Sequence, residues 1–253
     1  MIRYSEEKKA VINPCNFVKK IDNMPSIAIA CYSHILFKEI RDKYHLKKIG
    51  SLDYTDMNKE IYQISYKGAN YAVFMMSVGG PAAATCIEDM HAMGVKKFIV
   101  FGNCGVLDKE IEDLAIIIPN KAIRDEGVSY HYIPDSLEID VNQKYGNLFK
   151  ELLNKLNYSY VEGKTWTTDA FYRETKEKVA WMKEHGAKCV DMEVASISAV
   201  CQFRNIDLVT FFYAGDNLDN EYWDKRSLSG SDRVDDKIRV MDLALELASI
   251  IEE

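Results

Sequence analysis

The chain shows two spacings of apolar residues, one typical of strands and one typical of helices. Short apolar or alternating runs predict strands at residues 26–31, 60–66, 71–78, 97–102, 114–118, 158–167 and 208–213. Apolar residues three or four positions apart predict helices at residues 34–44, 82–93, 141–156, 174–185 and 232–251, and another that begins at Asp191. Strands that alternate with helices over short connections predict an α/β sheet layered with helices.

The sequence shows no linker segment, and the length of the chain limits the number of domains. A chain of 253 residues allows one large domain or two small ones. Residues 1–24 are polar and irregular, so we expect an N-terminal arm there and the folded part of the chain over residues 25–253. Because 47% of the residues are hydrophobic, the folded part has enough apolar side chains for a substantial core.

Charge and cysteine usage narrow the classes of partner. The formal net charge is -7 and the basic residues are scattered, so we expect no nucleic-acid partner. No apolar run approaches membrane-spanning length, and the first residues carry no apolar signal core, so we expect no membrane partner. The six cysteines (15, 31, 86, 104, 189 and 201) form no C-x-x-C pair, which favours buried thiols in the cytoplasm. Histidine spacing predicts no metal site.

Three glycine-containing loops follow predicted strands, where α/β sheets bind ligands. They are Ser77-Val-Gly-Gly-Pro81, Gly102-Asn-Cys-Gly105 and Gly215-Asp216. Glycine lets the backbone approach a ligand and exposes amide groups, although such turns are also common without one. The loops match neither dinucleotide-binding nor P-loop spacing, and Cys104 has no histidine partner in sequence that would make it a nucleophile.

Two acids mark the ends of the helix–strand unit that spans residues 189–217. Glu193 lies at the start of the predicted helix, and Asp216 lies at the end of the predicted strand. Acids at these places are typical of a helix N-terminus and of a strand-end turn. They are also the residues that a site at the strand ends would use, and the pattern alone leaves both interpretations open.

Five segments of the chain occur in the order and spacing of a known family. They are Ser77-Val-Gly-Gly-Pro-Ala-Ala-Ala-Thr-Cys-Ile87, Lys97-Phe-Ile-Val-Phe-Gly-Asn-Cys-Gly105, Thr168-Asp-Ala-Phe-Tyr172, Asp191-Met-Glu193 and Ala214-Gly-Asp216. Over roughly residues 25–250 the chain resembles the nucleoside phosphorylases, which include purine and uridine phosphorylases and adenosylhomocysteine-type nucleosidases. The resemblance implies one α/β domain with a twisted, partly barrel-like mixed sheet flanked by helices. It also implies cleavage of an N-glycosidic bond.

The same resemblance assigns roles to individual residues. Glu193 matches the acid that binds the ribose hydroxyls, and Met192 matches the methionine under the sugar. Phe171 matches the aromatic residue stacked on the base, and Val190 matches a neighbour of the base. Asp216 matches the acid that protonates or hydrogen-bonds a purine base, and is the expected catalytic residue. The other expected contacts are Thr168 at the base and Gly79, Gly80, Asn103, Cys104 and Gly105 around phosphate or another nucleophile.

The chain departs from the family mainly where phosphate binds. The segment Ala30-Cys-Tyr-Ser-His-Ile35 lacks the usual Gly and Arg, and Val100 and Asn103 replace an Arg and a Ser or Thr. Without both arginines, most of the bidentate charge for phosphate is missing. Thr175 and Glu177 replace the Gln and Arg of uridine-type members, so pyrimidine recognition by that route is unsupported. Other cations that are candidates for holding phosphate are Lys47, Lys48, Arg124, Arg173 and Arg226.

We therefore expect a nucleoside phosphorylase-type enzyme that cleaves a purine nucleoside in nucleoside salvage. Inorganic phosphate is the expected co-substrate, and no cofactor is expected. Two alternatives stay open: a nucleosidase that uses water, and a protein that binds nucleosides without cleaving them. Trp223-Asp-Lys-Arg226 is either a lid over the site or an ordinary surface loop. The resemblance also implies a homo-oligomer, either a dimer or a hexamer.

Overall fold

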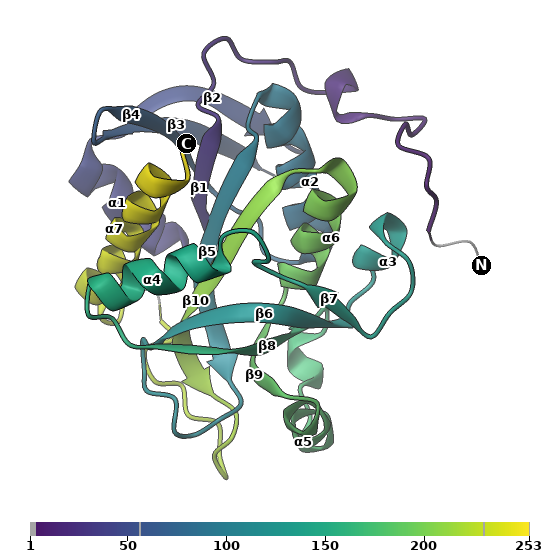
Figure 1. The fold of residues 1–253 in the computed structure, drawn as a ribbon, viewed down its shortest axis with the longest axis vertical. Coiled ribbons are helices and arrows are strands. Elements are labelled where there is room, and N and C mark those ends of the chain that lie inside the picture. Colours follow the sequence, from purple (N-terminus) through teal and green to yellow (C-terminus); the bar gives the residue numbers. More distant parts are fainter. Residues whose placement is uncertain (1–3, 56, 230, 253) are drawn as a thin grey trace.

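A mixed ten-stranded sheet forms the centre of the computed structural model, which describes residues 4–55, 57–229 and 231–252 (Figure 1). The strands are β1 (Ile27–Cys31), β2 (Lys47–Asp53), β3 (Asn58–Tyr66), β4 (Ala69–Met75), β5 (Lys97–Val106), β6 (Ile116–Asp125), β7 (Glu138–Asp140), β8 (Tyr160–Thr168), β9 (Ala187–Asp191) and β10 (Asp207–Asn217). The helices are α1 (His34–Tyr44), α2 (Gly80–Met93), α3 (Ser129–Tyr132), α4 (Gly146–Lys155), α5 (Lys176–Glu184), α6 (Val194–Arg204) and α7 (Val234–Ile251). Two short 3-10 turns are η1 (Pro14–Asn16) and η2 (Phe171–Arg173).

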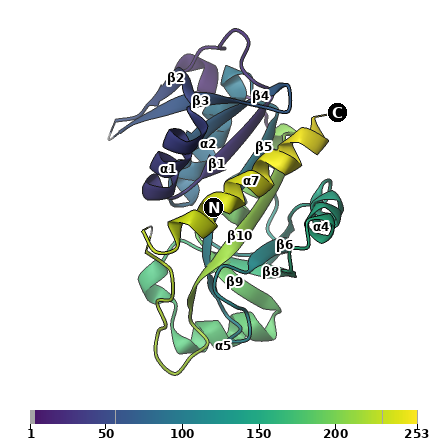
Figure 2. The ribbon, with the colours of Figure 1, turned by 90° about the vertical axis from the view of Figure 1, so that its left-hand side faces the viewer.

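Part of this sheet closes on itself. Strand β10 pairs in parallel with β5 and also pairs with β6, and the order β10-β6-β8-β9-β5 returns to its starting strand. The remaining strands, β1, β4, β3 and β2, continue from β5 as an open sheet, which lies above the closed part in Figure 2. The structure thus confirms the predicted α/β fold with a mixed, partly barrel-like sheet.

Helices cover both faces of the central strands, and β1 shows why the sequence requires it. All five residues of β1 are buried, with side chains on alternating faces. Ile27, Ile29 and Cys31 pack in a cluster with residues of α1, α4 and α7. Ala28 and Ala30 pack in a second cluster with residues of α2 and α6. A continuous apolar run is therefore the pattern that a strand between two helical layers needs.

The predicted strands and helices all occur, and the bounds of α1 agree with the prediction. Ser33 precedes the first residue of α1, and its side chain accepts a hydrogen bond from the Leu36 amide at 3.2 Å, so it caps this helix. Other starts were placed too early. The helix predicted from residue 141 begins at Gly146, and the one predicted from Asp191 begins at Val194. Among the described residues, no helix is long and apolar enough to cross a membrane.

Two predicted strand ends were wrong. Strand β5 continues through the predicted loop at residues 103–105, because Gly105 pairs with Val190 of β9 and Cys104 pairs with Ala214 of β10. Strand β6 continues past Pro119, where its register against β8 shifts and accommodates the missing amide. Strands β2, β7 and β9 were not predicted. These extensions lengthen the barrel at the edge where the candidate site lies.

Candidate active site

A cavity of about 180 Å³ lies where β5, β9 and β10 meet the segment before α5. It is lined by Tyr32, Val78, Asn103, Cys104, Gly105, Phe171, Glu174, Val190, Asp191, Met192, Glu193, Asp216, Leu218 and Leu228. The lining has four carboxyl groups, and no Lys or Arg is found among the described residues that form it. Such a surface suits a polar, electropositive ligand better than a multiply charged anion.

The junction between β9 and α6 separates the roles of its two acids. Asp191 Oδ1 accepts hydrogen bonds from the amides of Glu193 and Val194, both at 2.7 Å. Its other oxygen accepts the hydroxyl groups of Thr165 and Thr167 from β8. Asp191 therefore caps α6 and joins it to the barrel. For Asp191, the position at a helix start is therefore explained by its hydrogen bonds to the first amides of the helix.

Glu193 has a different environment. Its side chain is buried, faces the cavity and accepts the Gly79 amide at 2.7 Å through Oε1. Burial and, to a smaller extent, the nearby Asp191 carboxylate together raise the pKa of Glu193 to about 8. The backbone of Gly79 has φ +90°, a conformation that favours glycine and aims this amide at the carboxyl group. Gly79 thus supports Glu193 from outside the cavity lining, and Gly80 also lies outside that lining.

Asp216 lies at the end of β10 and is held by the loop that follows. The backbones of Asn217 and Asp224 exchange two hydrogen bonds, which close this loop. The closed loop places Trp223 beside Asp216, and the indole Nε1 donates to Oδ2 at 2.6 Å. Burial raises the pKa of Asp216, whereas the hydrogen bond from Trp223 opposes that rise. The segment that the sequence left as lid or surface loop therefore contacts the candidate catalytic acid.

Glu174 is a fourth carboxyl group in this cavity and was not predicted. It follows the turn η2 that carries Phe171, and it is partly buried. Burial raises the pKa of Glu174 to about 7, and the Asp216 carboxylate adds to the rise. The sequence offered one signal for a role of Glu174 in the site, its position three residues after Phe171. Asp216 belongs to a strand that is distant in sequence, and only the fold brings it into the same cavity as Glu174.

Tyr32 was also missed, and its hydroxyl group is unusual. The ring packs on Gly102, where an added Cβ would lie 2.8 Å from the ring edge. The hydroxyl oxygen is buried without a hydrogen-bond partner among the described residues. Burial, Glu193 and Asp191 raise the pKa of this phenol, so its proton stays on. An unpaired O–H group next to Glu193 is a donor available to a ligand.

Two further cavities adjoin the first and enlarge it toward ligand size. One of about 570 Å³ shares Tyr32 and Val78 with the first and adds His34, Lys59 and Ser77. The other, of about 400 Å³, shares Phe171, Glu174, Asp216 and Leu218 and adds Trp223. Lys59 is buried, and its Nζ donates to the Met76 carbonyl at 3.4 Å. The second cavity thus has a cationic side, whereas the first is acidic.

Most of the predicted site residues lie together. Those that line the first cavity are Asn103, Cys104, Gly105, Phe171, Val190, Met192, Glu193 and Asp216. Thr168 lies outside that lining, where its hydroxyl donates to Asp125 at 3.3 Å. Cys104 is buried, and burial raises the pKa of its thiol well above the usual value, so the group stays protonated. Within the described part of the chain, no group of His, Cys, Asp or Glu could hold a metal ion.

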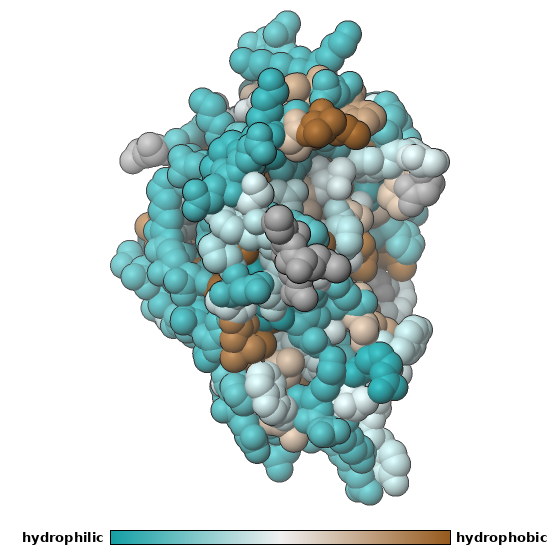
Figure 3. All heavy atoms as spheres, turned by 90° about the vertical axis from the view of Figure 1, so that its right-hand side faces the viewer, coloured by the Kyte–Doolittle hydropathy of each residue, from teal (hydrophilic) through white to brown (hydrophobic). Residues whose placement is uncertain are grey.

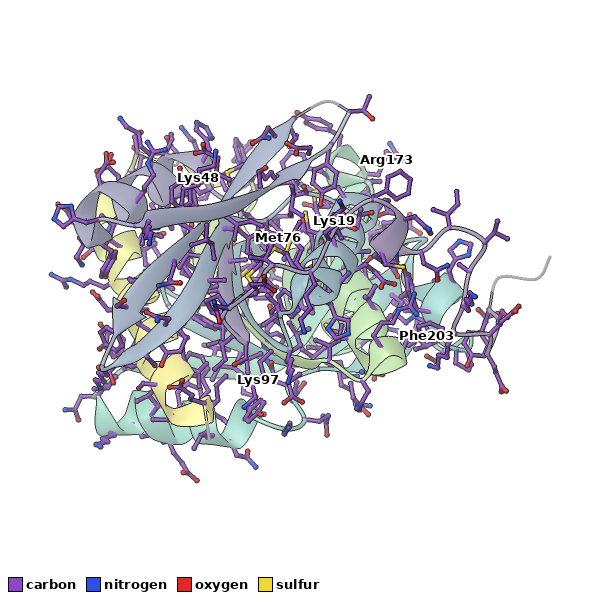
Figure 4. All side chains as sticks on the ribbon, turned by 90° about the horizontal axis from the view of Figure 1, so that it is seen from above. Lys19, Lys48, Met76, Lys97, Arg173 and Phe203 are labelled. Atoms are coloured by element: carbon purple, nitrogen blue, oxygen red, sulfur yellow. The ribbon has the colours of Figure 1, made fainter. Side chains whose placement is uncertain are left out.

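The cations considered for phosphate do not converge on one position. Arg124 is buried in its own loop, where it donates to Ser129 Oγ at 2.8 Å and to the Pro134 carbonyl. Lys48 pairs with Glu60 at 2.9 Å on the outer strand β2. Figure 4 shows Lys48 and Arg173 on opposite sides of Met76, well separated from each other. Arg226 donates to the Ile111 carbonyl and pairs with Asp224.

The fold and this cavity define an α/β protein with a candidate small-molecule site at the strand ends. A sequence profile described as the phosphorylase superfamily matches residues 26–251. The chain therefore belongs to the phosphorylase superfamily, which confirms the resemblance found in the sequence.

Known sequences of this superfamily are distant from the chain. Uncharacterized protein R802 of Acanthamoeba polyphaga mimivirus is 29% identical over 162 residues, 64% of this chain and 63% of that protein. Guanosine phosphorylase of Halorubrum lacusprofundi is 27% identical over 150 residues, 58% of this chain and 61% of that protein. The chain thus spans less than two thirds of these two relatives. A DeoD-type purine nucleoside phosphorylase of Buchnera aphidicola is 26% identical over 217 residues, 82% of this chain and 89% of that protein.

Solved structures agree with the fold over nearly the whole chain. Purine nucleoside phosphorylase from Toxoplasma gondii, in complex with immucillin-H, superposes with a TM-score of 0.78 at 18% identity. That match covers 93% of this chain and 96% of the other. A futalosine hydrolase mutant from Helicobacter pylori gives 0.70 at 16% identity, covering 90% and 99%. At these identities the likeness shows the fold alone, and the reaction has to be argued from the site.

Proposed function

We propose that this protein cleaves the N-glycosidic bond of a purine nucleoside and transfers the ribosyl group to phosphate. The observation that carries the proposal is the meeting of Glu193 and Asp216 in one cavity whose mouth carries Phe171. Two buried acids and an aromatic side chain that line one cavity suit a ligand made of a sugar and a planar base.

Each of these groups has a role in the proposed reaction. The transition state resembles a ribosyl cation, which the Glu193 carboxylate stabilises through the sugar hydroxyl groups. Asp216 gives its proton to the departing base, and the raised pKa of its carboxyl group favours that role near neutral pH. Phe171 stacks on the base, and Met192 packs under the sugar. With a pKa of about 8, Glu193 is mainly protonated near pH 7 in the free chain. Its proposed role as a carboxylate on the ribose hydroxyl groups therefore requires that it lose this proton when the nucleoside binds.

Phosphate needs positive charge, and the second cavity is where the chain offers it. Lys59 and His34 lie in its lining, and Tyr32 joins it to the cavity that holds Glu193. The named relatives that are phosphorylases favour this nucleophile. In this arrangement Lys59 supplies the charge that arginines supply elsewhere in the family.

Hydrolysis is the second candidate, and Tyr32 favours it. Its ring covers Gly102, beside the segment where the family holds phosphate, and its hydroxyl is an unpaired donor near Glu193. A hydroxyl group in that place suits a water molecule. The acidic lining of the first cavity repels a phosphate dianion and does not repel water.

Base release from adenosine, inosine, guanosine and uridine, with and without phosphate, tests the function and the nucleophile together. Ribose 1-phosphate formed only with phosphate supports phosphorolysis, and Lys59→Met then lowers phosphate affinity. Free ribose formed without phosphate supports hydrolysis, and Tyr32→Phe then lowers kcat.

Asp216→Asn tests the role of the acid in the same assay. We expect kcat to fall by about 10²–10⁴-fold with nucleoside affinity retained, because only proton donation is lost. Asp235→Asn, at an exposed position on α7, is the matched control and should behave as the parent does. A parent that releases no base from any of the nucleosides, in either buffer, contradicts the proposal and leaves a binding protein.

A further inference from the structure

The base end of the cavity holds two carboxyl groups, and only one of them has a role in the proposed function. Glu174 and Asp216 line the first cavity together, and both also line the adjoining cavity with Phe171 and Trp223. Glu174 makes no contribution to capping, because Thr175 Oγ1 accepts the Lys178 amide and caps α5. Its position is therefore explained better by a ligand than by local structure.

The cations that act on the two acids are paired elsewhere. Lys178 lowers the pKa of Glu174, and its Nζ donates to Asp125 Oδ2 at 2.7 Å. Arg226 lowers the pKa of Asp216 and pairs with Asp224. Lys176 lines the adjoining cavity. Two carboxyl groups that line one partly buried cavity resist double ionisation and hold one proton between them. The pair then presents one hydrogen-bond donor and one acceptor.

Hydrogen-bond chemistry indicates which base edge matches such a pair. A 6-aminopurine presents the N7 acceptor beside its N6 amino donor, whereas a 6-oxopurine presents two acceptors, N7 and O6. Trp223 already donates to Oδ2 of Asp216, so the remaining oxygen of Asp216 serves the base. In the free chain burial and the Asp216 carboxylate raise the pKa of Glu174. The proposed role of Asp216 at N7 draws the shared proton onto Asp216 in the complex, which leaves Glu174 ionised to accept the amino group.

We infer that Glu174 is a specificity-determining residue whose carboxylate accepts the amino group of a 6-aminopurine while Asp216 serves N7. This rests on the proposed function and extends it, because it selects adenosine-type over inosine-type nucleosides. A 6-oxopurine would place its carbonyl oxygen against the ionised carboxylate, which costs binding because two acceptors meet without a proton between them.

The ratio of kcat/KM for adenosine to that for inosine tests this inference. We expect the parent to favour adenosine by at least about tenfold, the effect of one lost hydrogen bond to a charged group. Glu174→Gln should lower the ratio by about tenfold or more, since its amide donates to O6 of inosine. Glu177→Gln is the matched control, because this acid lies three residues after Glu174 in the first turn of α5, is exposed and is not part of the two cavity linings. Its ratio should equal that of the parent.

A ratio that Glu174→Gln leaves within twofold of the parent overturns the inference, as does a parent that favours inosine. Both outcomes leave the proposed function standing, because base is still released. A parent without turnover contradicts the proposed function instead. Calorimetric binding of adenosine and inosine then carries the test, and equal affinities for the parent would overturn the role of Glu174.

Discussion

At the scale of single residues, the environment of Glu193 has a consequence for stability. Burial raises the pKa of its carboxyl group from the ordinary 4.5 to about 8. Between these values the folded chain keeps a proton that the unfolded chain releases. The free energy of unfolding therefore falls as pH rises from about 4.5 to 8, by at most about 1.4 kcal/mol per pH unit for this group.

Glu193→Gln removes this titration, while its side-chain oxygen can still accept the Gly79 amide. We expect the variant to be close to the parent in stability at pH 4.5 and more stable than the parent at pH 8. Urea unfolding at several pH values measures the difference, with Glu177→Gln on the exposed face of α5 as the control. A difference that stays flat over this range would contradict the raised pKa.

The same residues show what a sequence can say about a site. Glu193 and Asp216 were named from their motifs, and the fold places both in one cavity. Glu174 and Tyr32 were not named, because their significance depends on neighbours from distant segments. A carboxyl group at a helix start and a tyrosine after a strand are ordinary until the fold places them beside other acids. Motifs therefore gave the part of the site that the family shares, and packing gave the part specific to this chain.

At the scale of elements, the contact between α2 and α6 holds the site. A Cβ added at Gly80 would collide with Ser196 Oγ, and that hydroxyl donates to the buried Glu126 at 2.6 Å. Gly80→Ala should lower the free energy of unfolding by about 1–3 kcal/mol through overpacking. It should also lower kcat/KM, because the adjacent Gly79 amide holds Glu193.

Thermal and urea unfolding of Gly80→Ala measure this effect. Gly127→Ala is a matched control, since the nearest atom to its added Cβ is Asp169 Oδ2 at 3.7 Å, an ordinary contact. Equal stability of the two variants would contradict this prediction, because α2 and α6 would then move apart without a cost in the free energy of unfolding.

Element prediction succeeded where the local pattern was strong and failed where pairing decided the outcome. The helix α1 was placed correctly because its apolar spacing and its Ser33 cap agree. Strand β9 has only five residues and was not predicted, and its last residue, Asp191, fell at the start of the predicted helix. The glycine-rich end of β5 has the composition of a loop, and its pairing with β9 and β10 cannot be seen in its own residues.

At the scale of the whole molecule, barrel closure depends on long-range pairing. Nothing local in residues 207–217 indicates that β10 pairs with both β5 and β6. The layered α/β class followed from alternating strands and helices, whereas the barrel followed only from the resemblance. The N-terminal arm at residues 1–24 stays a prediction. In the structure its 3-10 turn lies apart from the sheet, at the edge of the fold (Figure 1).

The mouth of the cavity carries exposed apolar side chains that favour contact with a second copy of the chain. Large apolar side chains are exposed there, with Val78 at 60%, Tyr172 at 93% and Trp223 at 58%. One face of the molecule, shown in Figure 3, is mainly hydrophilic and carries its apolar areas as separate patches. The exposed apolar side chains at the mouth are single residues, which suit several moderate contacts better than one large apolar interface. We therefore expect a homo-oligomer in which a second copy covers the mouth.

Light scattering at micromolar concentration should give a multiple of the single-chain mass, and specific activity should fall on dilution as copies separate. Tyr172→Ser should favour the smaller species, because it removes an exposed aromatic contact beside the cavity. Leu137→Ser, at another half-exposed apolar position, is the control and should leave the mass unchanged. A monomer with constant specific activity over a hundredfold dilution would contradict the prediction, and the open mouth would then belong to the working form of the site.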